Sequence, residues 1–334
     1  MARISNKIII KGLITLGLLG FLLYQMNLRT FVEIVSSASV PLILLAALVQ
    51  AGTSLLSVGR WKIILEDFHI RIDALSLTKL TFIGHFFNLF LPSAIGGDFF
   101  RAYYLSKRGN RGMSTTLTTT LLDRSAGLAA LLAIGTAAAA VHPIRIEGFS
   151  LIYLYLALIS GYVLASVALF HSWMHRRLTG FLKRRHLEGI EEKLELVYRG
   201  LRQLRKNHRA IAIVFGISLV IQFLAVVIIW IAARAIGIEA PFWVFLIFIP
   251  IVNLTIMIPL TINGHGLRES VYFLLFSRIG VPVEMAVTLS LLNFVIVALA
   301  SLPGGVVYSL YKRDEHIEIE GMSREMRERD REGI

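Results

Sequence analysis

The sequence predicts an all-α integral membrane protein with about six full transmembrane helices and two re-entrant broken-helix hairpins in an inverted-repeat arrangement. Three observations support this fold class. Hydrophobic residues make up 56% of the 334 residues and charged residues only 17%, whereas soluble domains average roughly 45–50% and 25%. Several apolar runs reach the about 20 residues that cross a bilayer. Two further apolar runs are interrupted by proline and glycine.

The predicted spans begin near the N-terminus. The first apolar run follows Arg3 and Lys7, as in a secretory signal peptide, but no small-residue cleavage site comes after it. We therefore interpret it as the first spanning helix. The six predicted spans are 8–26, 38–58, 114–140, 149–171, 210–233 and 284–311.

The two interrupted runs, about 74–108 and 241–279, are predicted to fold as hairpins. Proline ends a helix and glycine frees the backbone. Irregular backbone at membrane depth persists only where protein or a water-filled cavity satisfies its polar groups, so both hairpins are expected to line an internal site. The helix-breaking residues are Pro92, Gly96 and Gly97 in the first run and Pro259, Gly264 and Gly266 in the second.

The two interrupted runs also share their spacing. In each, Asn-Leu precedes the proline, and an arginine, Arg101 or Arg268, follows the proline by nine residues. The prolines are 167 residues apart. Interrupted segments at corresponding positions of two halves are typical of the binding site of a transporter.

The charge distribution predicts the orientation. Residues 172–209 hold eleven Lys or Arg against four Glu, which places this loop in the cytoplasm by the positive-inside rule. Counting spans outward puts both termini in the cytoplasm of a multi-pass cell-membrane protein, with one hairpin entering from each side. The net charge of +12 is explained by such loops and by interface anchors such as Arg60 and Trp61, so no nucleic-acid partner is expected.

Asp123 and Arg124 lie about ten residues into the third predicted span, roughly 15 Å deep. An unpaired charge at that depth costs at least roughly 2.5–3.5 kcal/mol. Adjacent helical residues diverge by about 100°, so each needs another partner. We expect Arg101 to pair with Asp123 and Glu269 to pair with Arg124. The alternative is a purely structural ion network that locks the hairpins.

The second break favours an anionic ligand. Glycines before Arg268 leave N–H groups at a helix start, which attract anions, and the guanidinium fork suits phosphate. Asp98, after Gly96 and Gly97, is equally well placed to cap the first return helix, and capping alone is the role we expect for its carboxylate. The predicted substrate-binding residues are Arg268, Arg124, Arg101 and Asn263, and the predicted charge network is Asp98, Asp123 and Glu269.

Other chemistries lack support in the sequence. The chain has no cysteine, which excludes thiolate catalysis and disulfides. His85 and His265 are isolated, and no nucleotide-binding or serine-hydrolase motif is present. We therefore expect no metal, no cofactor and no ATP-driven transport.

Four segments resemble the lysylphosphatidylglycerol synthase transmembrane region family, which are flippase-like membrane proteins. They read GHFFNLFLPSAIGGDFFRAYYLSKR, LLDRSAGL, PLTINGHGLRES and LPGG. The resemblance implies a single flippase-like transmembrane domain at 1–312, followed by a charged cytoplasmic tail at 313–334. Members with an aminoacyltransferase domain add an amino acid to phosphatidylglycerol and move the product across the membrane. We expect this chain to lack that domain and not to aminoacylate lipid itself.

The resulting expectation is a transporter, not an enzyme, that flips an anionic lipid or a lipid-linked amphiphile such as a phospholipid or polyprenyl-phosphate sugar. Two alternatives stay open. One is a membrane-embedded enzyme that modifies a lipid-linked substrate with Asp98, Asp123 or Glu269 as acid or base. The other is a non-transporting scaffold of a lipid-synthesis complex. Expected partners are membrane lipids and lipid-synthesis enzymes, and small residues at 137–140 are compatible with a homo-oligomer.

Overall fold

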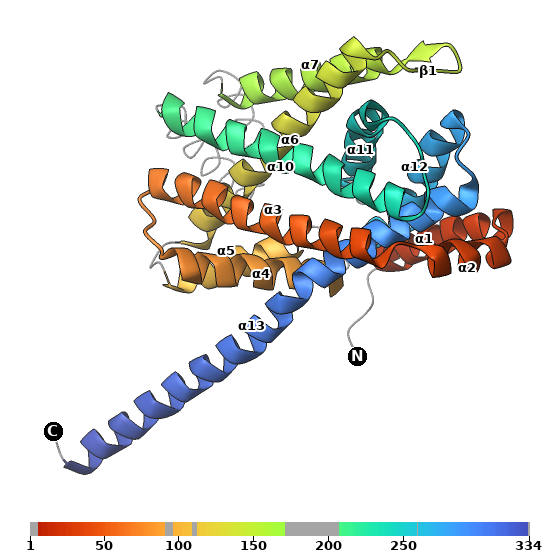
Figure 1. Cartoon of the computed structure of the whole chain (residues 1–334). Coiled ribbons are helices and arrows are strands. Elements are labelled where there is room, and N and C mark those ends of the chain that lie inside the picture. Colours follow the sequence, from red (N-terminus) through yellow and green to blue (C-terminus); the bar gives the residue numbers. More distant parts are fainter. Residues whose placement is uncertain (1–5, 91–95, 109–111, 171–206, 259, 333–334) are drawn as a thin grey trace.

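The computed structural model describes residues 6–90, 96–108, 112–170, 207–258 and 260–332. In these ranges the chain forms eleven α-helices, one 3₁₀ helix and one two-stranded antiparallel sheet (Figure 1). The elements are α1 (Asn6–Gln25), α2 (Leu28–Ser37), α3 (Val40–Asp67), α4 (Ala74–Phe90), α5 (Gly96–Arg108), α6 (Met113–Val141), β1 (Arg145–Ile146), β2 (Phe149–Ser150), α7 (Leu151–Phe170), α10 (His208–Ala235), α11 (Phe242–Ile256), α12 (Leu267–Phe276), η1 (Ser277–Ile279) and α13 (Val283–Glu332). The predicted all-α class is confirmed.

The number of spans differs from the prediction. In the described part of the chain, four helices are long and apolar enough to cross a membrane: α3, α6, α10 and the Val283–Leu310 part of α13. A fifth span is reached if α1 and α2, which meet at a 90° bend, are taken together. The apolar segments Leu151–Val167 and Phe242–Ile256 are shorter than the about 20 residues that a span requires. The chain is therefore a multi-pass membrane protein whose described part has four or five candidate spans, fewer than the six predicted.

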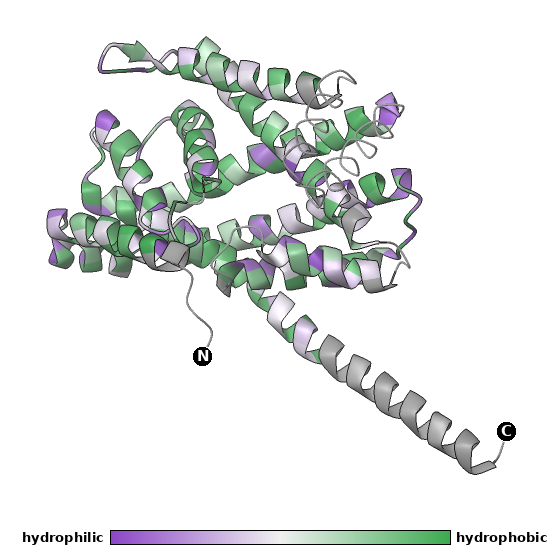
Figure 2. Cartoon of the chain, turned by 180° about the vertical axis from the view of Figure 1, so that it is seen from behind, coloured by the Kyte–Doolittle hydropathy of each residue, from purple (hydrophilic) through white to green (hydrophobic). Residues whose placement is uncertain are grey.

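The helices pack as a bundle crossed by α13. Helix α10 lies along α3 and also contacts α6, whereas α13 packs on α3, α4 and α12. Hydrophobic residues cover most of the bundle helices (Figure 2). Beyond the bundle α13 continues as a helix to Glu332 and extends away from the other elements (Figure 1), so the predicted tail at 313–334 begins inside a continuous helix.

The largest apolar core lies between α6, α7, α10, α11, α12 and α13. Tyr155 of α7 is fully buried in it and donates a hydrogen bond to the carbonyl oxygen of Ile247. Gly135 of α6 makes room for this ring, since a Cβ there would overlap the phenol of Tyr155. Small residues let membrane helices approach closely, and here a single glycine admits an aromatic ring between two helices.

The LPGG segment has a packing role in α13. A Cβ on Gly304 would overlap the backbone of Phe82, and a Cβ on Gly305 would lie 2.6 Å from the ring of Phe86. Both phenylalanines belong to α4. The two glycines therefore let α13 pass directly over the first helix of the first hairpin, and they fix that hairpin against the bundle.

Candidate functional site

The first predicted hairpin consists of α4 and α5, which pack against each other. Their crossing requires two glycines. A Cβ on Gly97 would overlap the carbonyl oxygen of Gly84, and one on Gly84 would lie 2.6 Å from the Arg101 side chain. Asn88 of α4 accepts a hydrogen bond from the Gly97 N–H at 2.8 Å. This bond ties the start of α5 to α4. Pro92 lies outside the described residues.

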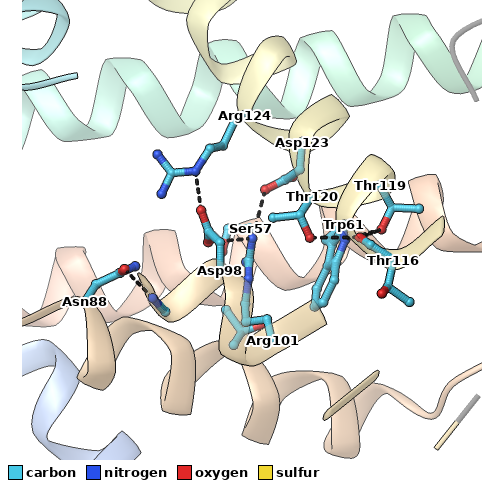
Figure 3. A network of polar contacts seen from close by, with 12 residues as sticks. Ser57, Trp61, Asn88, Asp98, Arg101, Thr116, Thr119, Thr120, Asp123 and Arg124 are labelled. Carbon is cyan, nitrogen blue, oxygen red and sulfur yellow. Dashed lines mark hydrogen bonds and ion pairs between the residues drawn. The ribbon is translucent and has the colours of Figure 1, made fainter. Parts of the chain in front are cut away.

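Asp98 in the first turn of α5 binds two arginines. Its Oδ1 lies 3.1 Å from Nη2 of Arg101, one turn further along α5. Its Oδ2 accepts a hydrogen bond from Nε of Arg124 on α6. Figure 3 shows the carboxylate between the two guanidinium groups. Asp98 lies in the first turn of α5, and because each of its two oxygens contacts an arginine, capping is not its only role.

Asp123 is the second carboxylate of the group. Its nearest partner is Arg60 of α3, whose Nε donates to Oδ1 at 2.7 Å. Nη2 of Arg101 lies 3.7 Å from Oδ2. Arg60 also donates from Nη1 to the Ser218 hydroxyl of α10 at 3.0 Å. Asp123 therefore connects three helices, and Arg60 extends the connection to a fourth.

Arg101 lies over an aromatic ring. Its guanidinium carbon is 4.5 Å from the centroid of the Trp61 ring, and the indole N–H of Trp61 donates to the Thr119 hydroxyl at 3.3 Å. The Arg101 side chain is only 4% exposed. Among the described residues its Nε has no hydrogen-bond partner. A cation held over a ring in a dehydrated place is stabilised by roughly 2 kcal/mol, so Trp61 positions Arg101 for its carboxylates.

We call Arg60, Asp98, Arg101, Asp123 and Arg124 the charge cluster. It joins α3, α5 and α6, and four of its members are buried. Arg124 is the exception, because its side chain is 32% exposed. With the carboxylates ionised, the described members carry three positive and two negative charges. The accessible end of the cluster is Arg124.

The second predicted hairpin consists of α11 and α12, which also contact each other. The connecting loop contains three residues with positive φ: Asn263 at 52°, Gly264 at 78° and Gly266 at 80°. A Cβ on Gly264 would lie 2.8 Å from Ile256, and one on Gly266 would lie 3.0 Å from Leu18 of α1. Glycine is therefore required at both positions, because it adopts a positive φ without strain and leaves room for the neighbouring side chains. Pro259 is outside the described residues.

Arg268 and Glu269 bind each other at the start of α12. Nη2 of Arg268 lies 2.9 Å from Oε1 of Glu269, and the Ser290 hydroxyl contacts both side chains at 3.0 Å. Oε2 of Glu269 accepts the Gly266 N–H at 2.6 Å. Arg268 and Glu269 are buried. One backbone N–H of the predicted anion site is therefore bonded to a carboxylate of the chain, and the pair has no net charge.

The two hairpins meet at an asparagine pair. The side-chain nitrogen of Asn263 donates to the carbonyl oxygen of Asn88 at 3.1 Å, across 175 residues of sequence. The neighbouring Ile262 N–H donates to the Thr15 hydroxyl of α1 at 3.0 Å. Asn88 also accepts a hydrogen bond from the Gly97 N–H. Asn88 therefore links the loop of the second hairpin to the start of α5.

The predicted pairings are partly confirmed. Asp123 contacts Arg101 as expected, although Arg60 is nearer. The predicted pair of Arg124 and Glu269 is wrong, since Arg124 binds Asp98 and Glu269 binds Arg268. The structure brings Asp98, Arg101, Asp123 and Arg124 together, and it places Arg268, Glu269 and Asn263 at the other hairpin.

Several residues of the site were missed or misread. Arg60 and Trp61 were predicted to be interface anchors, but both are buried beside the charge cluster. This prediction is wrong because their position at a span end agrees equally well with a helix end packed inside the bundle. The sequence held no signal for this contact, because Arg60 and Asp123 are 63 residues apart. Ser218 and Ser290 gave no signal in the sequence.

The described residues hold no group of three His, Asp or Glu side chains arranged for a metal ion. The polar groups of the site are guanidinium, carboxylate, hydroxyl and amide. Guanidinium groups bind phosphate and carboxylate through paired N–H donors, so the arrangement is suited to an anion.

Helices of spanning length around a buried, partly accessible charge cluster define a multi-pass membrane protein with an internal polar site. The chain belongs to the lysylphosphatidylglycerol synthase TM region family, whose sequence profile matches residues 8–304. This confirms the resemblance of the four segments, and it associates the chain with a membrane region of lipid modification and translocation. A search of curated proteins found no match.

Proposed function

We propose that this protein moves an anionic lipid, or a lipid-linked amphiphile such as a phospholipid or polyprenyl-phosphate sugar, between the two leaflets. The observation that carries the proposal is the buried charge cluster between α3, α5 and α6, which holds three arginines and has Arg124 at its accessible end. An ionised side chain inside a membrane segment is costly, so such residues mark substrate pathways by default.

The headgroup is proposed to bind at Arg124. A phosphate there competes with the Asp98 carboxylate for the same guanidinium, and Arg101 lies on the other side of Asp98. The acyl or prenyl tails stay in the hydrocarbon. Arg268 and Asn263 are proposed as further contacts on the opposite hairpin, and Asp98, Asp123 and Glu269 hold the arginines when substrate is absent.

The transport cycle is proposed to use the two hairpins as an inverted repeat. Each of the four helices is shorter than a span, and glycines stand at the start of α5 and immediately before α12. With both termini and the basic 172–209 loop in the cytoplasm, the hairpins approach the membrane centre from opposite faces. The Asn263–Asn88 hydrogen bond then lies at their meeting point, where closing and opening alternate access to either leaflet.

The protein is proposed to act as a transporter and not as an enzyme. Its partners in this proposal are membrane lipids and the enzymes that supply them, with a homo-oligomer as a further option.

The test is reconstitution of the purified protein into liposomes with fluorescent lipids of different headgroups. We expect movement of at least one anionic lipid, and a loss of about tenfold or more in rate for Arg124→Gln, since a charge-assisted hydrogen bond contributes roughly 1.5–3 kcal/mol. Arg29→Gln is the matched control, because Arg29 is 90% exposed and remote from the cluster. Chemical conversion of the lipid supports the enzyme alternative. A folded protein with neither activity supports the scaffold.

A further inference from the structure

Helix α2 is a short helix that turns sharply away from α1. The two helices meet at a 90° bend. The Asn27 side chain caps the first turn of α2, because it accepts hydrogen bonds from the N–H groups of Arg29 and Thr30. Ten residues of α-helix extend over about 15 Å. A helix of this length cannot cross a bilayer by itself.

Both ends of α2 are fixed at the ends of candidate spans. At its start, the Asn27 N–H donates to Oε1 of Glu284, in the first turn of α13, at 2.9 Å. Beyond its end, the Ser39 N–H donates to the carbonyl oxygen of Ala235, the last residue of α10, at 2.8 Å. Helix α3 begins at the next residue, Val40. Because spans begin or end at both points, α2 runs along one face of the membrane.

One side of α2 packs on the bundle. Ile34 is buried in the largest apolar core. Phe31 packs on a small apolar cluster that contains Leu22, Met26 and Val287, and α2 as a whole contacts α13. These contacts fix the rotation of α2 about its axis, and they thereby decide which side chains point away from the bundle.

An exposed apolar row lies on a second side of α2. Its members follow the i, i+4, i+7 spacing of one helix face. They are Leu28, Val32 and Val35, which are 60%, 62% and 50% exposed. In α3, which follows directly, Val40 and Leu44 are equally exposed, at 60% and 59%. The exposed apolar side chains of a spanning helix face lipid, so the row on α2 continues along the chain into a lipid-facing surface.

An exposed polar row lies beside the apolar row. Arg29, Glu33 and Ser36 each follow a member of the apolar row by one residue, which turns them by about 100° around the helix. Arg29 and Glu33 form an ion pair at 3.2 Å, so the two charges balance. A helix with one polar and one apolar exposed face is suited to the boundary between water and hydrocarbon.

We propose that α2 is an interfacial helix that binds the membrane surface, with Leu28, Val32 and Val35 at the acyl-chain boundary and the polar row in water. A protein docked on the apolar row would also cover the adjacent ion pair, whereas a bilayer covers only one of the two rows. In the proposed orientation this surface is the outer leaflet. The inference goes beyond lipid movement, since it holds whether or not the charge cluster binds a headgroup.

The experiment measures the depth of spin labels on α2. The chain has no cysteine, so single cysteines can carry nitroxide labels in the full-length protein in phosphatidylcholine liposomes. Val32→Cys reports the apolar row, Ser36→Cys the polar row, and Leu44→Cys is the lipid-facing reference. Power saturation with oxygen and with a water-soluble nickel chelate gives each depth. We expect the Val32 label to lie about 5–10 Å inside the headgroup boundary and the Ser36 label to lie in water.

A second pair of labels keeps the test informative if one of the first labels disturbs the helix. Leu28→Cys and Arg29→Cys repeat the comparison of the two rows in the first turn of α2. We expect the same contrast, with the Leu28 label in lipid and the Arg29 label in water.

Three outcomes would overturn the inference. High accessibility of both rows to nickel would place the whole helix in water. Low accessibility of the Val32 label to both oxygen and nickel would show a protein contact, such as a second copy of the chain. A Val32 label that enters lipid only when anionic lipid is added would show attraction by charge, not burial of the apolar row. None of these outcomes decides the proposed function, which lipid movement tests.

Discussion

The ion pair of Asp123 and Arg60 gives the sharpest energetic prediction. Nε of Arg60 lies 2.7 Å from the carboxylate, and the two side chains are 8% and 5% exposed. Asp123→Asn leaves the Arg60 guanidinium buried with the Ser218 hydroxyl as its remaining described partner. Removing one member of a buried ion pair lowers the stability of a protein by roughly 3–5 kcal/mol. We expect a loss of about that size in the free energy of unfolding for Asp123→Asn.

The double substitution Arg60→Gln with Asp123→Asn removes both charges together. It is expected to be less destabilising than the sum of the single changes, with a coupling energy of about 1–3 kcal/mol. The corresponding cycle for Asp123 and Arg101 is expected to give less coupling, because their distance is 3.7 Å and Arg101 is closer to Asp98. The measurement is reversible unfolding in mixed micelles for each variant of both cycles.

The control is the pair of Arg29 and Glu33, which are 90% and 64% exposed at a distance of 3.2 Å. Exposed helical pairs of this spacing contribute about 0.3–0.5 kcal/mol. If the cycle of Arg60 and Asp123 gives no more coupling than this control, the pair does not hold α3 to α6 and the reasoning fails.

Three other predictions concern packing, recognition and orientation. Gly97→Ala is expected to destabilise the protein by about 1–3 kcal/mol or more through overlap with Gly84, whereas Gly216→Ala, with open space at its Cβ, is expected to be neutral or stabilising in the same unfolding assay. Arg268→Lys keeps the charge but loses the fork that binds Glu269 and Ser290, so transport and the melting temperature are both expected to fall; a wild-type rate and melting temperature would contradict this role of the fork. A cysteine in place of Asn207 is expected to resist an impermeant maleimide in intact cells, and labelling equal to that of a cysteine in the β1–β2 turn would contradict the proposed orientation.

The sequence predicted the class and the broken segments well, because both are local properties. Twenty-residue apolar runs need no knowledge of neighbours, and the positive φ values of Gly264 and Gly266 follow from glycine in an interrupted run. The one predicted span that is not found is 149–171, because the described apolar part of α7 covers only Leu151–Val167. The bend between α1 and α2 depends on tertiary contacts.

Ion-pair partners were the least predictable feature. Helix α6 has no marked apolar face, so its rotation about its own axis cannot be read from the residue pattern. Asp123 and Arg124 diverge by about 100°, and the rotation decides which neighbour each one meets. The observed rotation turns Asp123 to α3 and Arg124 to α5. Arg60 is the partner that the pattern could not single out.

The two hairpins are similar in sequence but differ in electrostatics. In the second, Arg268 and Glu269 are adjacent, bonded to each other and supported by Ser290, so that hairpin is neutral. In the first, Asp98 binds both Arg101 and Arg124, and the Arg124 side chain is 32% exposed. A buried guanidinium bonded to the adjacent carboxylate is less accessible to an incoming anion than a partly exposed one. We therefore infer that the first hairpin carries the anion, and that the second acts on it through the Asn263–Asn88 bond, which reaches the residue that fixes the start of α5.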